Sequence, residues 1–191
     1  MKFQWRTLDK ARREIRVLDL DAGVSTSPLN GHLRHISLDV LEKPLYETIS
    51  YAWGETTLAE HILVDGGVIN IPASAVSALQ YMRLPDKSRA LWIDCICIDQ
   101  QDEMEKNHQV ALMSDIYTNS QQTLSYIGED DGTAAKAFEG IELIHKVLRK
   151  QAKGSIDLPQ IHHMEMGTAD LLRLQGIEPA IRGILTRPYF R

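Results

Sequence analysis

The chain has 191 residues, of which 43% are hydrophobic and 25% are charged, and these proportions are ordinary for a single α/β domain. Its net charge of −5 argues against a general nucleic-acid binder, which usually carries a basic face. No apolar run approaches the roughly 18 residues that span a membrane, and the first six residues contain no signal-peptide core. We therefore expect a cytoplasmic protein without nucleic-acid or membrane partners.

The first part of the chain predicts strands. Residues 14–20 place apolar side chains on one face and residues 32–40 alternate, so we expect two strands, the second antiparallel or at an edge of the sheet. Residues 46–51 are rich in β-favouring side chains and run directly into Gly54, which predicts a third strand followed by a turn. A strand that ends in such a turn is a plausible place for a binding loop.

A hairpin and a helix follow in the sequence. Residues 61–71 hold the tight-turn sequence Asp-Gly-Gly, at residues 65–67, between two apolar runs, and this pattern predicts the hairpin. Pro72 suits the start of a helix, which Asn70 or Ser74 could cap.

The most apolar stretch of the chain comprises residues 91–98, in which Asp94 is the single charged residue. A run this dense predicts a strand buried on both faces of a parallel sheet. On such a strand Cys95 and Cys97 point to the same face and cannot bridge each other, so we expect two small buried thiols. A buried carboxylate is costly unless it is paired or has reached a crevice. Asp94 and the nearby Asp99 are therefore candidate site residues.

The helix after this strand has a clear start signal. Asp102 can cap its first turn, and Glu105 stands where the reciprocal partner of a capping box belongs. Apolar spacing predicts an inner stripe along the helix, made of Gln109, Val110, Met113, Ile116 and Tyr117.

The last third of the chain predicts one more strand and three helices. Residues 123–127 form the strand, and residues 134–150 form an amphipathic helix. The predicted inner stripe of that helix comprises Phe138, Ile141, Ile144, Val147 and Leu148. Residues 153–166 have no period and predict a long loop, and two short helices are expected at residues 168–175 and 179–185.

The order of these elements predicts an α/β fold, in which the strands that begin near Tyr46, Leu91 and Thr123 are parallel neighbours. Ligands of such sheets bind in the crevice beyond the carboxyl ends of the strands. The candidate ligand-binding residues lie there and comprise Ser50, Trp53, Gly54, Glu55, Asp94 and Asp99.

Each candidate also has a purely structural reading. Trp53 offers a ring for stacking and Gly54 allows a ligand to approach the backbone, but Trp53 could instead lock a turn in the core. Asp94 and Asp99 could instead brace the floor of the crevice. The pair His162-His163 has no Cys or Glu at metal-ligand spacing, so we expect no metal site.

Three segments, in this order, resemble the fungal heterokaryon-incompatibility (HET) domain. Residues 46–54 read Tyr-Glu-Thr-Ile-Ser-Tyr-Ala-Trp-Gly, residues 91–100 read Leu-Trp-Ile-Asp-Cys-Ile-Cys-Ile-Asp-Gln, and residues 105–117 begin Glu-Lys-Asn-His-Gln-Val. The family carries closely similar segments, and the departures here are mild: Ile49 for Leu, Asp99 for Asn and Lys106 for Arg.

The resemblance implies a flavodoxin-like or Toll/interleukin-receptor (TIR)-like α/β fold. In that fold a mainly parallel sheet is flanked by helices, with an added N-terminal strand and a β-hairpin. It also implies one domain over residues 1–191, with its core at about residues 15–150 and with a loop and short helices over residues 151–191.

The functional implication is programmed cell death and allorecognition, a form of innate immunity. The domain would act through self-assembly or through protein partners such as other HET or NLR-type proteins. The alternative is TIR-like cleavage of NAD, with NAD as substrate rather than cofactor and with residues 50–55 at the substrate site. In this family the matching catalytic glutamate belongs to a segment that follows an Arg-Pro-Trp-Phe-like sequence. Residues 187–191 resemble the start of that sequence and then the chain ends, so the catalytic residue is unknown and we expect either a truncated chain or a shortened member of the family.

Overall fold

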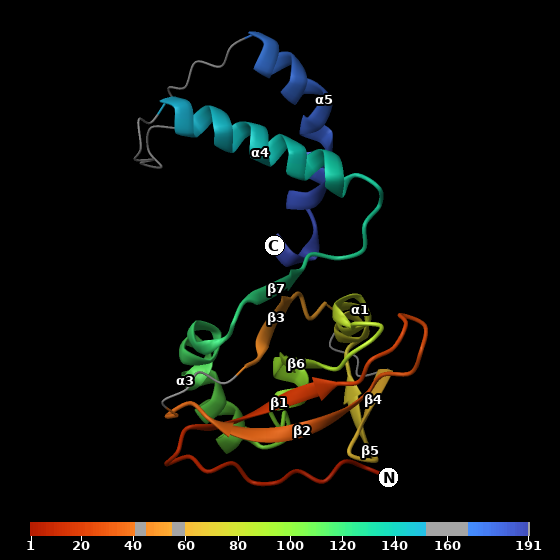
Figure 1. The fold of residues 1–191 in the computed structure, drawn as a ribbon, viewed down its shortest axis with the longest axis vertical. Coiled ribbons are helices and arrows are strands. Elements are labelled where there is room, and N and C mark those ends of the chain that lie inside the picture. Colours follow the sequence, from red (N-terminus) through yellow and green to blue (C-terminus); the bar gives the residue numbers. More distant parts are fainter. Residues whose placement is uncertain (41–44, 55–59, 152–167, 191) are drawn as a thin grey trace. The chain divides into compact units, whose positions relative to one another are not determined.

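The computed structural model describes residues 1–40, 45–54, 60–151 and 168–190, with the backbone alone for residues 147, 148, 150, 151 and 168–176. The chain divides into two compact units, Met1–Tyr126 and Ile127–Arg191, and each is described by itself (Figure 1). The single domain expected over residues 1–191 stays a prediction.

Seven strands of the first unit form one sheet in the order β5-β4-β2-β1-β6-β3-β7. Their bounds are β1 Glu14–Leu20, β2 Asn30–Ser37, β3 Glu47–Tyr51, β4 Glu60–Val64, β5 Gly67–Ile71, β6 Arg89–Trp92 and β7 Thr123–Tyr126. The pairs β2–β4, β6–β3 and β3–β7 are parallel, and the pairs β5–β4, β2–β1 and β1–β6 are antiparallel. The α/β class is thus confirmed. The sheet is mixed rather than mainly parallel, because β1 and β2 insert between the hairpin and the parallel strands.

Most of the predicted strands are confirmed, including the three parallel neighbours β6, β3 and β7. The hairpin is also confirmed. Its turn places Asp65 at φ 49° and Gly66 at φ 76°. Positive φ at both central residues is typical of the type I′ turn, whose twist matches that of the two strands of a hairpin.

The strand predicted over residues 91–98 is wrong in its second half. Strand β6 ends at Trp92, and the next residues form a single helical turn, α2 (Asp94–Cys97), in which the Cys97 amide donates to the Ile93 carbonyl at 2.9 Å. Cys95 and Cys97 therefore lie on a helical turn, although both are buried free thiols as expected. The apolar run reflects burial on every side, which periodicity alone does not assign to a strand or a helix.

Two longer helices join the sheet in one core, α1 (Ala73–Met82) and α3 (Glu103–Asn119). The Trp92 ring meets the Tyr117 ring edge-on with centroids 5.8 Å apart, and the Tyr46 hydroxyl donates to the Ile116 carbonyl at 2.6 Å. These contacts fix α3 against the parallel strands and so position the loops that follow β3 and β6.

The helix caps and stripes are only partly as predicted. Asp102 caps α3 by accepting hydrogen bonds from the Met104 and Glu105 amides. Neither Asn70 nor Ser74 caps α1, whose N-cap is Pro72 without a side-chain bond. Within α3 the buried positions are Glu105, Gln109, Leu112 and Ile116, whereas Val110 is 52% exposed. The buried stripe thus follows a strict three- and four-residue spacing that Val110 does not share.

The second unit is built from α4 (Ala134–Gln151), α5 (Thr168–Leu185) and a short 3₁₀ turn η2 (Pro188–Phe190). The two short helices predicted after residue 167 are wrong, because α5 is continuous with Pro179 inside it. The core of this second unit contains Ala137, Ala180 and Ile184. The predicted loop at residues 153–166 lies outside the described residues.

The predicted inner stripe of α4 is displaced around the helix. Phe138 and Ile141 are 52% and 42% exposed, whereas Ala137 is buried. A Cβ added at Gly140 would come within 2.8 Å of the Ile181 side chain, so small residues let α5 approach α4 closely. The side chains of Val147 and Leu148 lie outside the described residues.

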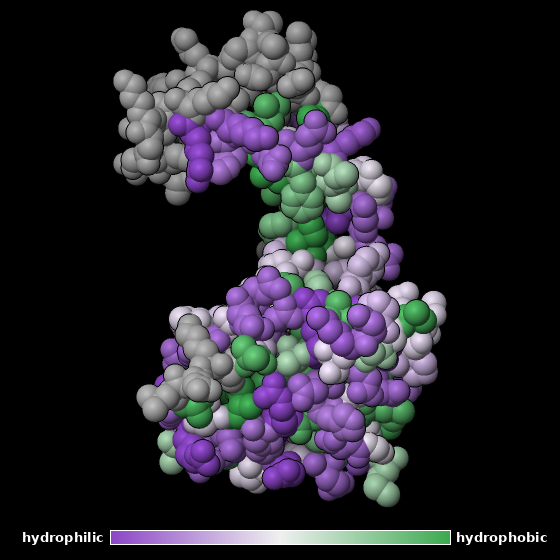
Figure 2. Space-filling model, in the orientation of Figure 1, coloured by the Kyte–Doolittle hydropathy of each residue, from purple (hydrophilic) through white to green (hydrophobic). Residues whose placement is uncertain are grey.

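The surface of the first unit in Figure 2 is mostly hydrophilic, with scattered apolar residues. Among the helices in the described part of the chain, none is both long and apolar enough to cross a membrane.

Candidate functional site

The carboxyl ends of β3 and β6 lie side by side because the two strands are parallel neighbours, with Thr48 opposite Trp92. After β3 the chain reaches Trp53 and Gly54, and after β6 it enters α2 at Asp94. Gly54 adopts φ 63°, a conformation that favours glycine. The predicted meeting of the two loops is confirmed by this geometry.

Asp94 is the polar centre of this edge of the sheet. Its Oδ2 accepts a hydrogen bond from the Trp53 indole Nε1 at 2.8 Å, and its Oδ1 accepts from the Tyr51 hydroxyl at 3.2 Å and from the Cys95 amide at 2.7 Å. Asp94 and Trp53 were both predicted as site residues, but Tyr51 was not. The three donors tie the loop after β3 to the turn after β6.

Burial raises the pKa of the Asp94 carboxyl above its usual range, while the hydrogen bonds from Trp53, Cys95 and Tyr51 act in the opposite direction. Burial also raises the pKa of the Tyr51 hydroxyl, which therefore stays protonated and serves as a donor to Asp94. A carboxylate held by three donors acts as a brace for Trp53, which is the structural reading of Asp94.

A cavity of about 550 Å³ lies beside this brace, within the first unit. Its lining comprises Lys2, Phe3, Trp5, Trp53, Val68, Ile69, Asn70, Cys95, Ile98, Asp99, Gln100 and Gln101. Pockets of this size with apolar and aromatic walls and a few polar groups are the usual form of ligand sites. The cavity is the candidate functional site.

The candidate residues relate to this cavity in different ways. Trp53 and Asp99 line it, and Asp94 supports Trp53 from behind. Ser50 lies on β3 opposite Ser125 of β7 and does not line the cavity. Gly54 is next to Trp53 but has open space around it, and Glu55 lies outside the described residues.

Asp99 lines the cavity and is held in a turn by two hydrogen bonds. Its amide donates to Glu105 Oε1 at 2.8 Å, and its Oδ1 accepts from the Gln101 amide at 3.0 Å. We call residues 99–101 the lip of the cavity.

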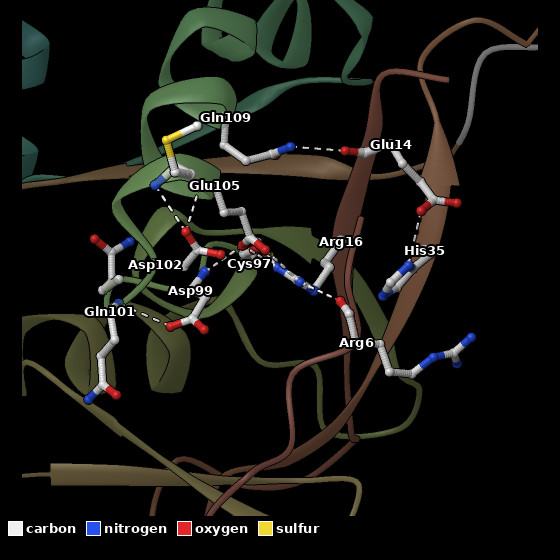
Figure 3. A network of polar contacts seen from close by, with 12 residues as sticks. Arg6, Glu14, Arg16, His35, Cys97, Asp99, Gln101, Asp102, Glu105 and Gln109 are labelled. Carbon is white, nitrogen blue, oxygen red and sulfur yellow. Dashed lines mark hydrogen bonds and ion pairs between the residues drawn. The ribbon is translucent and has the colours of Figure 1, made fainter. Parts of the chain in front are cut away.

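A buried ion pair behind the lip was missed in the sequence. Arg16 of β1 and Glu105 of α3 form a bidentate pair, with Nη1–Oε1 at 2.6 Å and Nη2–Oε2 at 2.9 Å, and their exposed fractions are 1% and 7% (Figure 3). Glu105 thus does not close the predicted capping box. The signal for this pairing is weak: Arg16 stands between the apolar residues Ile15 and Val17 of β1.

The N-terminal segment was also missed, because residues 1–10 show no period. Lys2, Phe3 and Trp5 supply one side of the cavity, and we call them the N-terminal wall. Phe3 and Trp5 pack edge-on with ring centroids 5.0 Å apart, and the Trp5 ring lies 4.7 Å from the Arg16 guanidinium.

The two thiols do not supply a nucleophile. Burial raises the pKa of the Cys95 thiol, and it raises that of Cys97 to about 12. Both remain protonated at neutral pH, and it is the thiolate that reacts. Within the described ranges no group of three or more His, Cys, Asp or Glu side chains is arranged to hold a metal ion.

Comparison with known proteins places this geometry in a family. Residues 46–191 match the family model described as heterokaryon incompatibility protein (HET). The chain is also similar to heterokaryon incompatibility protein 6, OR allele, of Neurospora crassa, with 34% identity over 122 residues. That alignment covers 54% of this chain but only 18% of the relative, and no solved structure matches. The family match over most of the chain, which includes the loops after β3 and β6 and the whole of α3, shows that the chain belongs to the heterokaryon incompatibility (HET) family.

Proposed function

We propose that the chain is a signalling domain of the heterokaryon-incompatibility type, which triggers cell death after non-self recognition. Its membership of the HET family, together with the relative named for heterokaryon incompatibility, is the observation that carries the proposal. We further propose that it acts through self-assembly or through binding of a protein partner.

The geometry at Asp94 supports a binding module over a catalyst. A group that transfers protons needs a free position facing its substrate. Donors of the protein itself occupy three of the roughly four acceptor positions of the Asp94 carboxylate, so this carboxylate chiefly stabilises the loop that carries Trp53. Trp53 then presents its ring to the cavity as a preformed contact surface.

The experiment is inducible expression of the chain in a fungal host, with cell viability as the readout. We expect loss of viability on induction. Trp92→Ala is the control, since Trp92 is fully buried and its loss should unfold the domain and abolish killing. Normal growth on induction of a folded, well-expressed chain would contradict the cell-death role.

Self-assembly is tested separately with the purified chain by sedimentation over a wide concentration range, with and without an extract of the host. Concentration-dependent oligomers support self-assembly, and a complex that forms only in the extract supports a partner. A monomer in both conditions, together with harmless expression, would overturn the proposal.

A second candidate function is TIR-like cleavage of NAD, and with it a TIR-like classification of the fold. The observation that favours it is the aromatic-lined cavity at the carboxyl ends of β3 and β6, which carries the Asp99 carboxylate. In this reaction the bond between the ribose and nicotinamide breaks, water adds to the ribose carbon, and nicotinamide, ADP-ribose and a proton are released. A carboxylate near the ribose stabilises the oxocarbenium-like transition state, as in glycoside hydrolysis.

Release of free nicotinamide from NAD by the purified chain tests this second function. We expect Asp99→Asn to abolish the release, and Asp102→Asn, which alters only the cap of α3, to retain it. Absence of nicotinamide release by the unmodified chain would rule the activity out for this chain.

A further inference from the structure

The N-terminal segment, residues 1–6, pairs with the outer edge of β5 through a single bridge of two backbone hydrogen bonds. The Phe3 amide donates to the Val68 carbonyl at 3.1 Å, and the Val68 amide donates to the Met1 carbonyl at 2.9 Å, in a parallel bridge between Lys2 and Val68. In an antiparallel hairpin, alternate residues point outward, so the Asn70 backbone faces the same side as that of Val68. Asn70 makes no backbone hydrogen bond to residues 1–6, so the segment leaves β5 after this single bridge.

Packing of this segment is partial: Phe3 and Trp5 contact the core of the first unit but are only partly buried. The segment lies between the 550 Å³ cavity and a second cavity of about 390 Å³, and Lys2 and Phe3 line both. Its close approach to β5 depends on a glycine, because a Cβ at Gly67 would come within 2.6 Å of the Phe3 Cα. A segment with cavities on both sides and few backbone bonds belongs to the low-stability end of a structure.

The buried Arg16–Glu105 pair connects this segment to the opposite side of the cavity (Figure 3). Arg16 Nη2 donates to the Arg6 carbonyl at 2.6 Å, and the Trp5 ring covers the Arg16 guanidinium. On the other side, Arg16 Nη1 donates to the Cys97 carbonyl at 3.2 Å, and Glu105 Oε1 accepts from the Asp99 amide. One ion pair therefore holds both the N-terminal wall and the lip.

Only one direct bond joins the two sides. Lys2 Nζ donates to Gln101 Oε1 at 3.0 Å, and both residues are exposed, so water competes for this contact. The N-terminal wall is therefore positioned chiefly by Arg16 and by the two backbone bonds at Val68.

We propose that residues 1–6 form a detachable wall of the cavity and that the Arg16–Glu105 pair is the latch that keeps it closed. Release of residues 1–6 opens the cavity and exposes the outward-facing backbone of β5 at Val68 and Asn70. The device lies in the first unit, and its test needs neither a ligand nor a cell-death readout.

The first test displaces the wall without touching the latch. Gly67 does not adopt a positive φ, so Gly67→Ala keeps its backbone conformation, and the three atoms nearest to the added Cβ all belong to Phe3. We expect hydrogen exchange of the Val68 amide to accelerate at least tenfold, while the Ile69 amide, which faces β4, keeps its protection. Gly183→Ala is the matched control, since its added Cβ meets open space.

The second readout is labelling by N-ethylmaleimide of the two buried thiols. Cys95 lines the cavity and Cys97 does not, so opening of the wall should expose Cys95 alone. We expect Gly67→Ala to speed the labelling of Cys95 at least tenfold and to leave Cys97 unlabelled.

The third test breaks the latch. Glu105→Gln should reproduce the effect of Gly67→Ala on Val68 and Cys95. Its matched control is Glu47→Gln, which disrupts another bidentate pair, with Arg89, that has no contact with the cavity. If Glu105→Gln unfolds the domain, Gly67→Ala alone decides. A folded Gly67→Ala protein with unchanged exchange and labelling would overturn the proposal, as would labelling of Cys95 and Cys97 at equal rates.

Discussion

Two carboxylates support the cavity from different sides, and they are satisfied by different chemistry. Asp94 accepts hydrogen bonds from three neutral donors, Tyr51, Trp53 and Cys95, which lie at or just after the ends of the neighbouring strands β3 and β6. Glu105 is paired with a guanidinium that lies 89 residues away in the sequence. The first acid organises a local loop, and the second joins the N-terminal segment, β1, α2 and α3. We therefore expect loss of Glu105 to destabilise the whole first unit, and loss of Asp94 to destabilise mainly the loop that carries Trp53.

The largest effect is expected for Glu105→Ala. This change leaves the Arg16 guanidinium buried without its anion, and breaking one side of a buried pair costs about 3–5 kcal/mol. Denaturant unfolding measures the cost, with Glu103→Ala, which removes an exposed acid of the same helix, as the control. A loss of stability equal to that of the control would show that the latch is not a strong contact.

Smaller effects are expected at the Asp94 brace. Trp53→Phe keeps an aromatic ring but removes the indole donor, which leaves Asp94 Oδ2 without its partner at a cost of about 1–3 kcal/mol. Thermal unfolding measures this cost, and Trp5→Phe is the matched change, since no hydrogen bond to Asp94 is lost there. Equal destabilisation by both changes would contradict the role of the indole N–H.

The stabilising contributions of Asp94, held by neutral donors, and of Glu47, paired with the Arg89 guanidinium, should also change in opposite directions with pH. The folded-state pKa of Asp94 is raised by burial, so the folded state binds more protons than the unfolded state above the ordinary pKa of an aspartate. The stabilising contribution of Asp94 is therefore greatest at low pH and falls as pH rises through its folded-state pKa. The Arg89 hydrogen bond lowers the pKa of Glu47, so the contribution of Glu47 is present at neutral pH and is lost as pH falls through its folded-state pKa.

Unfolding free energies of Asp94→Asn and Glu47→Gln, each compared with the unmodified chain from pH 3 to pH 7, measure these opposite slopes. The stability lost through Asp94→Asn should shrink as pH rises, and that lost through Glu47→Gln should grow. Slopes of the same sign would contradict the assigned directions.

The smallest effect is expected for Lys2→Met. This change removes an exposed hydrogen bond to Gln101, and exposed contacts of this kind contribute less than about 0.5 kcal/mol. Unfolding should shift by no more than that amount. A loss above about 1 kcal/mol would show that the direct bond, rather than the Arg16 latch, holds the N-terminal wall.

The contrast between the local Asp94 brace and the long-range Arg16–Glu105 pair also explains which parts of the structure the sequence predicts. Apolar and β-favouring runs predict most of the strands, turn residues predict the hairpin, and the order of the elements predicts the parallel arrangement of β3, β6 and β7. The meeting of Trp53 with Asp94 follows from that topology. Helix α2 was not predicted, because an unbroken apolar run carries no period. The Arg16–Glu105 pair was hidden because Glu105 also satisfies a local capping pattern. The N-terminal wall was hidden because its position depends on one backbone bridge and on the missing side chain of Gly67.

The proposed role of the chain as a HET-family signalling domain depends on Asp94 as a brace for the Trp53 loop. The most direct measurement is the killing activity of induced Asp94→Asn, set beside its thermal unfolding and beside Asp19→Asn, a change in a half-exposed acid paired with Arg34. We predict that Asp94→Asn lowers the unfolding temperature and that killing falls in proportion to the folded fraction, while Asp19→Asn changes neither. A fully folded Asp94→Asn chain that has lost all killing activity would contradict the claim and make Asp94 a functional acid.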